Sequence, residues 1–217
     1  MRILLADDHS LILAGIRQLL ERRHEIVGTA ENGRALVRAA EALKSDLIVL
    51  DISMPLLNGI DAAREIRAQL PRTKFVFLSM HTSAIYLRKA IDAGALGYVL
   101  KSEATEELLN AIEDVQAGRL YISPGFGEDV IANAHDWLNR PLEKAIPLTG
   151  RQRQILQMVA EGRQNKEIAQ IVHISVKTVE FHRGRLMRRL GAHSVAELTK
   201  FAIQEGLVTL PDSEDSL

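Results

Sequence analysis

The chain has 217 residues, of which 47% are hydrophobic and 25% are charged, and its formal net charge at pH 7 is -1. This composition predicts a soluble globular protein of one or two domains. The absence of cysteine excludes disulfides and thiolate metal sites. The apolar run before Asp7 and Asp8 is too short for a signal peptide or a membrane span, so we expect a cytoplasmic protein.

The small net charge hides an uneven distribution. Lys and Arg number 14 against 16 Asp and Glu in residues 1–117, but 10 against 5 in residues 148–210. Residues 211–217 form an acidic tail, with 0 Lys or Arg and 3 Asp or Glu. The basic segment predicts an anionic partner, most simply nucleic acid.

Short apolar runs alternate with amphipathic segments from residue 1 to about residue 118. The apolar runs predict strands at 3–6, 25–30, 47–50, 75–78 and 97–100. The amphipathic segments predict helices at 10–21, 32–43, 58–69, 83–93 and 104–117. Strands that alternate with helices of this length predict an α/β fold, with a five-stranded, parallel, doubly wound sheet covered by helices on both sides.

Polar side chains directly follow four of these strands: Asp7, Asp8, Asp51, Ser79 and Lys101. Taken alone, Asp51 most often begins a turn after a buried strand. However, the carboxyl ends of parallel strands meet at one edge of the sheet, where open α/β sheets bind their ligands. Carboxylates gathered there repel one another. A hard divalent cation such as Mg²⁺ relieves that repulsion and leaves positions open for phosphate oxygens.

Together with Met54-Pro55 and Gly59, these residues resemble the signature of a bacterial two-component receiver domain, which has a flavodoxin-like fold. The resemblance implies that Asp51 is the phosphoacceptor and attacks a phosphohistidine on a partner sensor histidine kinase. Such phosphoryl transfer needs mostly positioning and electrostatic stabilisation of the oxygens. The resemblance also implies that the protein is not an enzyme in the usual sense, because it catalyses only its own phosphoryl transfer and slow self-dephosphorylation.

The same resemblance implies how Mg²⁺ and phosphate are held. Asp8 and Asp51 bind Mg²⁺ directly, as does the backbone carbonyl of Ser53. Asp7 binds the ion through water, and Lys101 neutralises the phosphoryl oxygens. Many receivers carry Pro after this lysine, with a cis peptide bond, whereas Ser102 follows Lys101 here.

Ser79 and Tyr98 are the switch residues that the resemblance implies. The Ser79 hydroxyl turns onto the new phosphate, and Tyr98 then rotates inward and changes the face built by the fourth helix, fifth strand and fifth helix. A half-buried strand aromatic explains Tyr98 equally well. Ser53 and His81 occupy positions that tune phosphate lifetime in the family, and His81 either orders a hydrolytic water or is only an exposed loop side chain.

Residues 119–147 break the alternation of strands and helices. Turn residues occur at Ser123-Pro124-Gly125, and Pro141 and Pro147 oppose helix continuation. Apolar residues recur at helical spacing at Val130, Ala134, Trp137 and Leu138. We predict a linker with one amphipathic helix and a domain boundary at about 139–147. Trp137 is interpreted as a core anchor, with a regulatory contact as the alternative.

Four helices are predicted in residues 148–210. Thr149 begins the first helix, Gly162 ends it, and the second begins at Asn165. A turn at His173-Ile174 leads to the third helix, which Ser175 caps and which ends at Leu190, and Ser194 caps the fourth. The third helix carries Lys177, Arg183, Arg185, Arg188 and Arg189. Two short helices joined by a tight turn, the second of them basic, predict an all-α helix-turn-helix domain that reads the DNA major groove.

Short motifs in this domain resemble the LuxR-type helix-turn-helix. They are Leu148-Thr149, Arg151, Asn165-Lys166-Glu167-Ile168-Ala169, Ile174-Ser175, Lys177-Thr178-Val179-Glu180, His182-Arg183 and Leu190-Gly191. With the receiver signature in front, the chain resembles the NarL/FixJ class of response regulators over residues 1 to about 117 and 148–208. Family members often carry Glu where Gln152 stands, so we expect an ion pair near Arg151 to be missing.

The resemblance also implies which residues meet DNA and a second copy of the chain. The expected DNA contacts are Lys177, Thr178, Glu180, Phe181, His182, Arg183 and Arg185. The expected dimer face lies on the fourth helix, at Val195, Leu198 and Ala202. Gly184 lies inside the predicted recognition helix, where Gly costs about 0.8 to 1 kcal/mol relative to Ala. It either allows close approach to DNA or leaves a base unread.

The leading hypothesis is a transcriptional regulator that is phosphorylated at Asp51 in the presence of Mg²⁺ and then binds promoter DNA as a homodimer. RNA polymerase is a further candidate partner, and no membrane partner is expected. The alternative keeps DNA binding but replaces phosphorylation with a ligand or a partner protein. A third hypothesis, a Mg²⁺-dependent hydrolase, leaves the basic domain unexplained.

Overall fold

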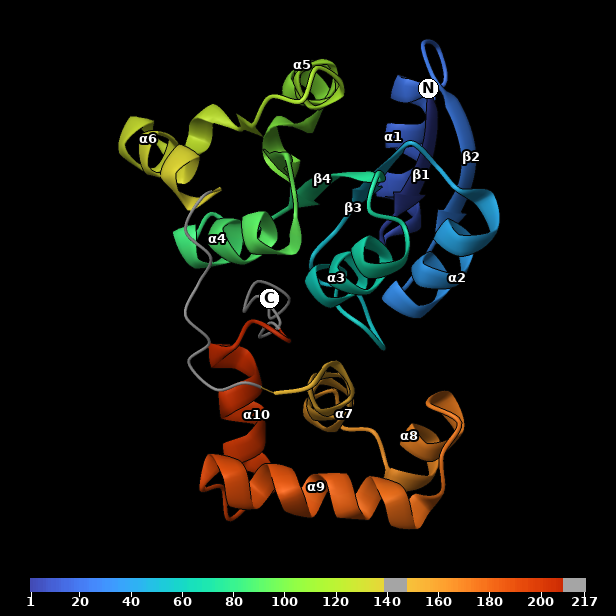
Figure 1. The fold of residues 1–217 in the computed structure, drawn as a ribbon, viewed down its shortest axis with the longest axis vertical. Coiled ribbons are helices and arrows are strands. Elements are labelled where there is room, and N and C mark those ends of the chain that lie inside the picture. The colour runs from blue at the N-terminus through green and yellow to red at the C-terminus, as the bar shows by residue number, and fades with distance from the viewer. Residues whose placement is uncertain (139–147, 209–217) are drawn as a thin grey trace, which may run out of the picture. The chain divides into compact units, whose positions relative to one another are not determined.

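The computed structural model describes residues 1–138 and 148–208 (Figure 1). The chain divides into two compact units, residues 1–145 and 146–217, and each unit has a hydrophobic core of its own. The predicted boundary at 139–147 and the acidic tail lie outside the described residues. Within the described ranges, no helix is long and apolar enough to cross a bilayer.

The first unit is built on a parallel sheet with the strand order β2-β1-β3-β4-β5-β6. The strands are β1 (Arg2–Ala6), β2 (Glu25–Ala30), β3 (Leu47–Leu50), β4 (Lys74–Ser79), β5 (Gly97–Leu100) and β6 (Tyr121–Ile122). The helices are α1 (Ser10–Leu20), α2 (Gly33–Leu43), α3 (Gly59–Gln69), α4 (Ala84–Ala93), α5 (Ala104–Gln116) and α6 (Glu128–Trp137). The five predicted strand–helix units are therefore confirmed, each within one residue at either end.

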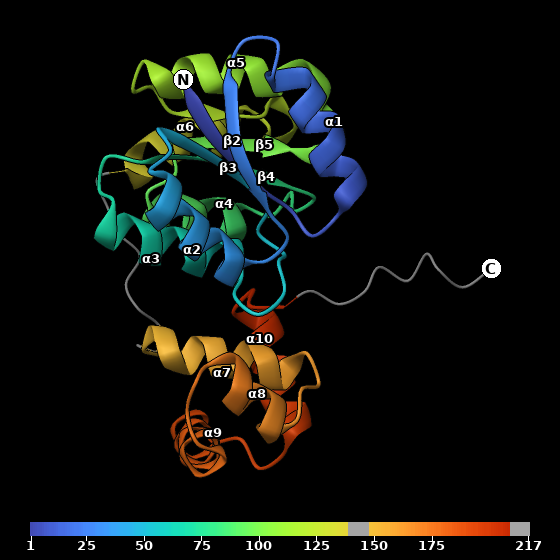
Figure 2. The same ribbon diagram turned by 90° about the vertical axis from the view of Figure 1, so that its right-hand side faces the viewer.

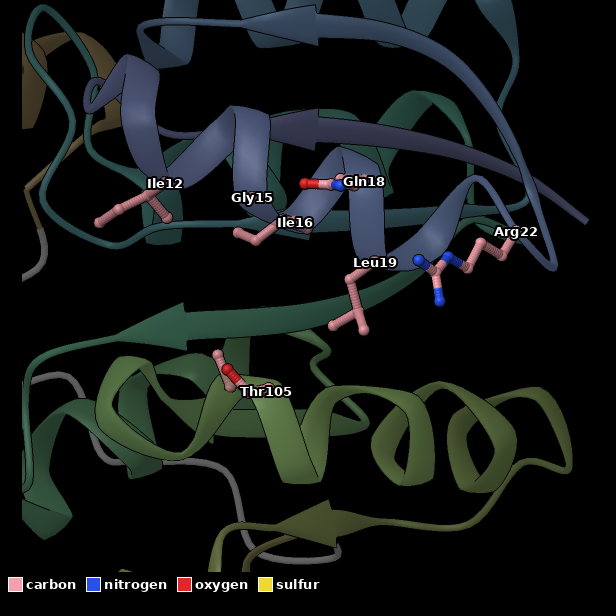
Figure 3. A pocket seen from close by; sticks show the side chains of 8 residues that line it. Ile12, Gly15, Ile16, Gln18, Leu19, Arg22 and Thr105 are labelled. Atoms are coloured by element: carbon pink, nitrogen blue, oxygen red, sulfur yellow. The ribbon is translucent and has the colours of Figure 1, made fainter.

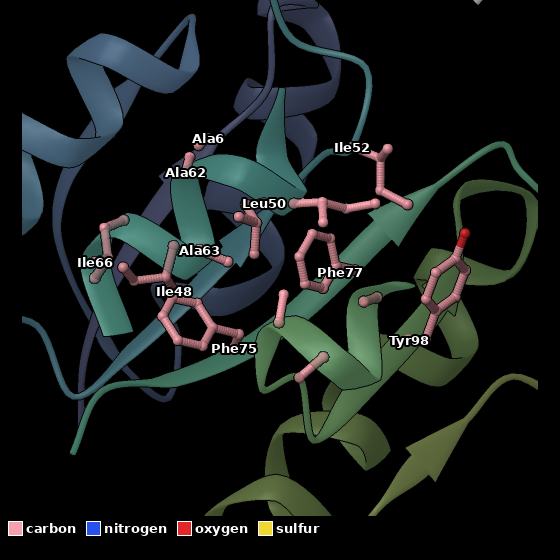
Figure 4. Close-up of a cluster of buried hydrophobic side chains, with 14 of the residues drawn as sticks. Ala6, Ile48, Leu50, Ile52, Ala62, Ala63, Ile66, Phe75, Phe77 and Tyr98 are labelled. Carbon is pink, nitrogen blue, oxygen red and sulfur yellow. The ribbon is translucent and has the colours of Figure 1, made fainter. Parts of the chain in front are cut away.

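Both faces of the sheet are covered by helices (Figure 2). In β3, all four residues are buried, and alternate residues contribute to the two cores: Ile48 and Leu50 to one, Leu47 and Val49 to the other. The Ile48 side packs against α2, α3 and α4 and contains the aromatic rings of Phe75 and Phe77 (Figure 4). The other side packs against α1 and α5. Burial on both faces explains why β3 is apolar throughout.

The prediction of five strands was wrong by one, because β6 pairs in parallel with β5. The Ser123 hydroxyl accepts a hydrogen bond from the backbone N–H of Leu100 at 2.9 Å, and this bond continues the pairing to the carboxyl end of β5. A strand of two residues is too short to show alternation, so the sequence pattern contained no signal for it. Phe126 follows β6 and is buried in the same core as Phe77.

The predicted amphipathic helix is confirmed as α6, which packs against α4. Ala134 is fully buried, and Trp137 packs against the core with the guanidinium carbon of Arg88 at 5.3 Å from its ring centroid. These contacts agree with the interpretation of Trp137 as a core anchor. The described part of the predicted linker therefore belongs to the first unit by its packing.

The second unit consists of α7 (Gly150–Ala160), α8 (Asn165–Ile171), α9 (Val176–Leu190) and α10 (Val195–Gln204), as predicted. Thr149, Ser175 and Ser194 each accept a hydrogen bond from the third backbone N–H of the helix that follows. Gln152 completes a capping box, because its side chain accepts from the backbone N–H of Thr149 at 3.0 Å. Gln152 therefore stabilises the start of α7 without forming an ion pair.

Candidate functional site

The strand order places Asp7 and Asp51 at the point where the chain changes direction across the sheet. The chain runs from β1 outward to β2 and then returns past β1 to β3, so a crevice opens at the carboxyl ends of β1 and β3. The backbone N–H of Asp51 donates to Ala6 O at 2.8 Å and fixes the two strand ends beside each other. A Cβ atom on Gly59 would lie 1.9 Å from Asp51 O, so only glycine allows α3 to begin this close.

Lys101 lies between the two buried carboxylates. Its Nζ is 2.7 Å from Asp7 Oδ2 and 3.1 Å from Asp51 Oδ2, and all three side chains are at least 94% buried. Burial raises the pKa of the Asp51 carboxyl, and Lys101 only partly offsets that effect. Burial alone lowers the pKa of the Lys101 ammonium, but the charges of Asp51 and Asp7 outweigh it, so the pKa is raised. The ammonium is therefore held charged beside the candidate phosphoacceptor.

Asp8 and His9 extend this cluster toward solvent. The His9 Nδ1 atom is 3.1 Å from Asp7 Oδ1 and 3.0 Å from Asp8 Oδ1. Ligand atoms of Asp7, Asp8, His9 and Asp51 all lie within 4.8 Å of one another. Carboxylate oxygens are the ligands that Mg²⁺ prefers, so the donor set fits this ion. His9 carries no functional signal in the sequence, because only its tertiary contacts distinguish it from other residues that precede a helix.

His81 connects the candidate switch residues. Its backbone N–H donates to Ser79 Oγ at 3.2 Å, and its carbonyl accepts from the Tyr98 hydroxyl at 2.9 Å. Its imidazole Nε2 is 2.8 Å from Ser53 Oγ, and its ring stacks on Tyr86 with centroids 4.0 Å apart. The interpretation of His81 as only an exposed loop side chain is therefore wrong, because the imidazole bridges the segment after β3 and helix α4.

Tyr98 is 1% exposed, which is more deeply buried than the expected half-buried strand aromatic. Burial also raises the pKa of its hydroxyl. The ring is buried in the core, and its hydroxyl donates to the His81 carbonyl. Lys101 and Ser102 are joined by a trans peptide bond, because the described residues contain no cis peptide bond.

A groove of about 380 Å³ lies between α1 and the start of α5 (Figure 3). It is lined by Ile12, Gly15, Ile16, Gln18, Leu19, Arg22, Ala104 and Thr105. Both helices that line the groove begin near the acidic cluster. Helix α1 begins directly after His9, and helix α5 begins shortly after Lys101. Leu11, one helical turn before the lining residue Gly15 in α1, is 85% exposed.

The second unit contains the predicted helix-turn-helix, formed by α8, a turn and α9. His173 in the turn adopts a left-handed backbone conformation with φ of 54°, which reverses the chain between the helices. The guanidinium of Arg183 donates to Asn165 Oδ1 and ties α9 to the start of α8. Arg151 of α7 donates to Val172 O at 2.8 Å and supports the same turn. These contacts fix the start of α8 and the turn relative to the basic helix α9.

The predicted DNA contacts differ in exposure. Lys177, Glu180, Phe181 and Arg185 are exposed, whereas Thr178, His182 and Arg183 are partly buried. The Thr178 hydroxyl is 2.8 Å from Ser175 Oγ, so it also supports the helix start. Burial, followed by the nearby cations Arg151 and Arg185, lowers the pKa of His182. The exposed members therefore form the surface of α9 that is free to meet a ligand.

The predicted dimer face needs correction. Leu198 and Ala202 are fully buried in the core of the second unit, so they do not face a partner. Val195, at the start of the same helix, is 45% exposed. An apolar stripe on a helix serves a core or an interface equally well, and here most of it packs against α7.

Comparisons with known proteins agree with both halves of this description. Residues 3–113 match the response regulator receiver domain family, and residues 146–202 match the luxR family of bacterial regulatory proteins. The transcriptional regulatory protein MctR of Rhizobium johnstonii is 37% identical over 211 residues, with 96% of each chain covered. The oxygen regulatory protein NreC of Staphylococcus aureus is 33% identical over 215 residues, covering 96% of this chain and 99% of NreC.

A solved structure extends the likeness to the fold. RcsB from Salmonella enterica serovar Typhimurium, bound to promoter rprA in the presence of the phosphomimetic BeF₃⁻, is 25% identical. The match has a TM-score of 0.56 and covers 93% of this chain and 98% of RcsB. The chain therefore belongs to the NarL/FixJ class of two-component response regulators, DNA-binding transcriptional regulators with a receiver domain and a luxR-family helix-turn-helix domain.

Proposed function

We propose that the protein is switched by Mg²⁺-dependent phosphorylation of Asp51, which a partner histidine kinase supplies, and that phosphorylation controls its binding to promoter DNA. The observation that carries this proposal is the position of Lys101, whose Nζ bridges Asp7 and Asp51 at the carboxyl ends of β1 and β3. A buried carboxylate beside a fixed ammonium and further carboxylates suits phosphoryl transfer, which depends on positioning and charge stabilisation.

Asp51 supplies the nucleophile. One of its carboxylate oxygens attacks the phosphorus of a phosphohistidine, and the new O–P bond forms as the P–N bond breaks. The electron pair of the P–N bond stays on the ring nitrogen, and the imidazole leaves neutral because its other nitrogen already carries a proton. Its Oδ1 atom accepts a hydrogen bond from the N–H of Ile52 at 2.7 Å, which orients the carboxylate for this attack. Asp7, Asp8 and Asp51 would hold Mg²⁺, with the Ser53 carbonyl. The ion would neutralise charge on the carboxylates and phosphoryl oxygens.

Lys101 and Ser79 respond to the new phosphoryl group. Lys101 is already charged and buried beside Asp51, so it neutralises the phosphoryl oxygens without moving far. Ser79 Oγ accepts from the backbone N–H of His81, and its O–H can donate to a phosphate at Asp51, so rotation of the side chain toward the phosphate would break the bond from His81. The carbonyl of His81 also binds the Tyr98 hydroxyl, so a change at Ser79 reaches Tyr98 through one residue. We propose this connection as the first step of the switch.

The groove between α1 and α5 suits the kinase as its occupant. Its lining is mostly apolar, with Arg22 at one end, and only His9 separates the acidic residues Asp7 and Asp8 from the start of α1. A helix of the kinase that carries the phosphohistidine can then cover the groove while its imidazole reaches Asp51. The exposed side chain of Leu11 adds apolar surface beside this groove.

In the second unit, α9 enters the major groove of promoter DNA, and the exposed cations Lys177 and Arg185 supply attraction to phosphates. Two copies would read two half-sites about 34 Å apart, or a multiple of that distance. The exposed part of α10 around Val195 is the proposed contact between the two copies.

A phosphorylation assay tests this function. The full chain is incubated with acetyl phosphate and Mg²⁺, its mass is measured, and its affinity for promoter DNA is compared with and without the donor. We expect one phosphoryl group on the wild type, none on Asp51→Ala, and tighter DNA binding only where the group is present. Asp129→Ala, which removes an exposed carboxylate of α6, is the matched control and should respond as the wild type does.

Equal DNA affinities with and without the phosphoryl group would contradict the switch. In that case, control by a ligand or a partner protein becomes the better hypothesis. A phosphorylated Asp51→Ala protein would contradict the assignment of the acceptor.

A further inference from the structure

We propose that Phe181 and Gly184 of α9 select thymine in the target DNA, by forming an apolar surface that accepts its 5-methyl group. This inference deepens the proposed function and rests on the binding of α9 in the major groove.

Phe181 is exposed without a partner that buries it. Its side chain is 57% exposed, and it is the single aromatic residue among the exposed large hydrophobic residues of the described chain. A ring left in water forgoes the stabilisation that burial provides. The core of the second unit contains the residues on the opposite side of α9, Val179 and Leu186, but not Phe181. The ring is therefore available to a molecule outside the unit.

The ring is nevertheless held in place. Arg185 lies one turn later in α9, and its guanidinium carbon is 5.8 Å from the ring centroid of Phe181. The imidazole of His182 approaches the ring at an angle of 69°, with centroids 6.0 Å apart. A cation over the face of an aromatic ring is attracted to it. These two contacts restrict the ring before DNA binds, which lowers the entropy lost on binding.

Gly184 lies three residues after Phe181, so the two positions are neighbours on the helix surface. Nothing lies within 4 Å of the place where a Cβ atom of Gly184 would be, so no packing within the protein requires glycine there. Its φ is not in the left-handed region either. Glycine in the interior of a helix is unfavourable. The protein structure alone gives no reason for this residue, whereas close approach of a DNA strand or base edge does.

The surroundings of this apolar surface are polar. Lys177 and Arg188 are exposed on the same side of α9, and Glu180 is exposed beside Phe181. Cations at both ends favour contact with the phosphates that border the groove. Along the groove floor, the bases present hydrogen-bond donors and acceptors, and the thymine 5-methyl group is the apolar exception. An uncharged aromatic ring beside a glycine therefore fits thymine better than it fits cytosine, guanine or adenine.

Replacement of thymine by deoxyuridine tests the inference, because it removes only the methyl group. Duplexes that the full chain binds are selected from a random-sequence library, and each thymine is then replaced in turn. We expect at least one position in each half-site at which the Kd rises about fourfold, the effect of losing one buried methyl group, or about 0.8 kcal/mol. Phe181→Ala should raise the Kd for the original duplex. The variant should also bind the original and the deoxyuridine-substituted duplexes with equal Kd.

Two further variants separate this contact from general binding. Lys177→Ala should weaken binding to both duplexes equally and keep the fourfold ratio, because phosphate contacts carry no direct base information. Phe181→Leu keeps an apolar side chain and should retain part of the ratio.

Two results would overturn the inference in different ways. If the wild type binds its selected sites but no thymine is sensitive to deoxyuridine, the role of Phe181 and Gly184 is wrong while the proposed DNA binding stands. If the full chain selects no sequence at all, the inference and the DNA-binding part of the proposed function both fail.

Discussion

The ring of Phe126 meets the ring of Tyr98 edge to face, with centroids 5.1 Å apart and an angle of 89° between the planes. Tyr98 is the candidate switch residue, and Phe126 lies between β6 and α6, which the sequence pattern had assigned to a linker. The Arg88 guanidinium on α4 in turn lies over the Trp137 ring on α6. Phe126, from the segment predicted as a linker, is thus in direct contact with the ring of the candidate switch residue Tyr98.

Phe126→Ala tests this contact. Phe126 is 8% exposed, so its removal leaves a cavity beside Tyr98, and we expect the free energy of unfolding of the first unit to fall by about 3 kcal/mol. Urea unfolding followed by the fluorescence of Trp137, the one Trp in the chain, measures this loss. We also expect the gain in DNA affinity on phosphorylation to shrink.

The variant Phe126→Leu serves as the control, because it fills most of the cavity but lacks the ring edge. It should recover most of the stability and little of the phosphorylation response. A full response in Phe126→Ala would show that Tyr98 does not act through this contact.

The raised pKa of Asp51 predicts a pH dependence of stability. Because the folded protein binds this proton more tightly than the unfolded chain, the stability contribution is present at pH below the ordinary value of 3.8 and is lost as pH rises through the raised pKa. In the absence of divalent ions, Asp51→Asn should therefore be more stable than the wild type at neutral pH. The difference in stability between the variant and the wild type should shrink as pH falls toward 3.8. Lys101 still has Asp7 as its ion-pair partner in the variant.

Denaturant unfolding of both proteins in a chelating buffer, from about pH 4.5 to about pH 7.5, measures the difference between their free energies of unfolding. A constant difference across the range, or a less stable Asp51→Asn at neutral pH, would contradict burial as the dominant cause of the shift.

Lys101→Met should destabilise the first unit and make its stability depend on Mg²⁺. The substitution leaves Asp7 and Asp51 buried beside each other without the cation, and loss of one partner of a buried ion pair costs about 3 to 5 kcal/mol. Mg²⁺ should restore more stability to the variant than it adds to the wild type, because the ion replaces the lost positive charge. Unfolding free energies with and without Mg²⁺ measure both effects.

Lys74→Met is the matched control for this experiment. The Lys74 ammonium donates to the carbonyls of Val115 and Gln116 at the end of α5. Lys74 lies at the start of β4, at the end of the strand away from the acidic cluster. Its loss should cost stability that Mg²⁺ does not restore. Equal responses of both variants to Mg²⁺ would point to a nonspecific effect of the ion.

Sequence patterns predicted the convergence of Asp7, Asp51 and Lys101 because strand ends in a parallel sheet share one edge, whatever the details of packing. β6 could not be predicted from sequence patterns, since a strand of two residues carries no periodicity. The role of His81 was also missed, because its partner Ser53 is 28 residues away and only the fold brings them together. Leu198 was misassigned because the spacing of apolar residues does not tell whether a helix stripe faces the core or a partner.

Gly184→Ala should make the second unit more stable and its DNA binding weaker. Alanine is more favourable than glycine in a helix interior by about 0.8 to 1 kcal/mol, and its methyl group meets no atom within 4 Å. The same methyl group occupies the space in which DNA approaches α9 beside Phe181. The melting temperature should therefore rise and the DNA affinity should fall, both measured on the same preparation.

Gly15→Ala is the matched control for this substitution. Gly15 lies in the interior of α1, and a Cβ atom there also meets nothing within 4 Å, so the stability of the first unit should rise by a similar amount. Its DNA affinity should stay that of the wild type, because α1 belongs to the receiver. If Gly184→Ala binds DNA as tightly as Gly15→Ala does, then DNA does not approach the backbone of α9 at this point, and the glycine there has no explanation in recognition.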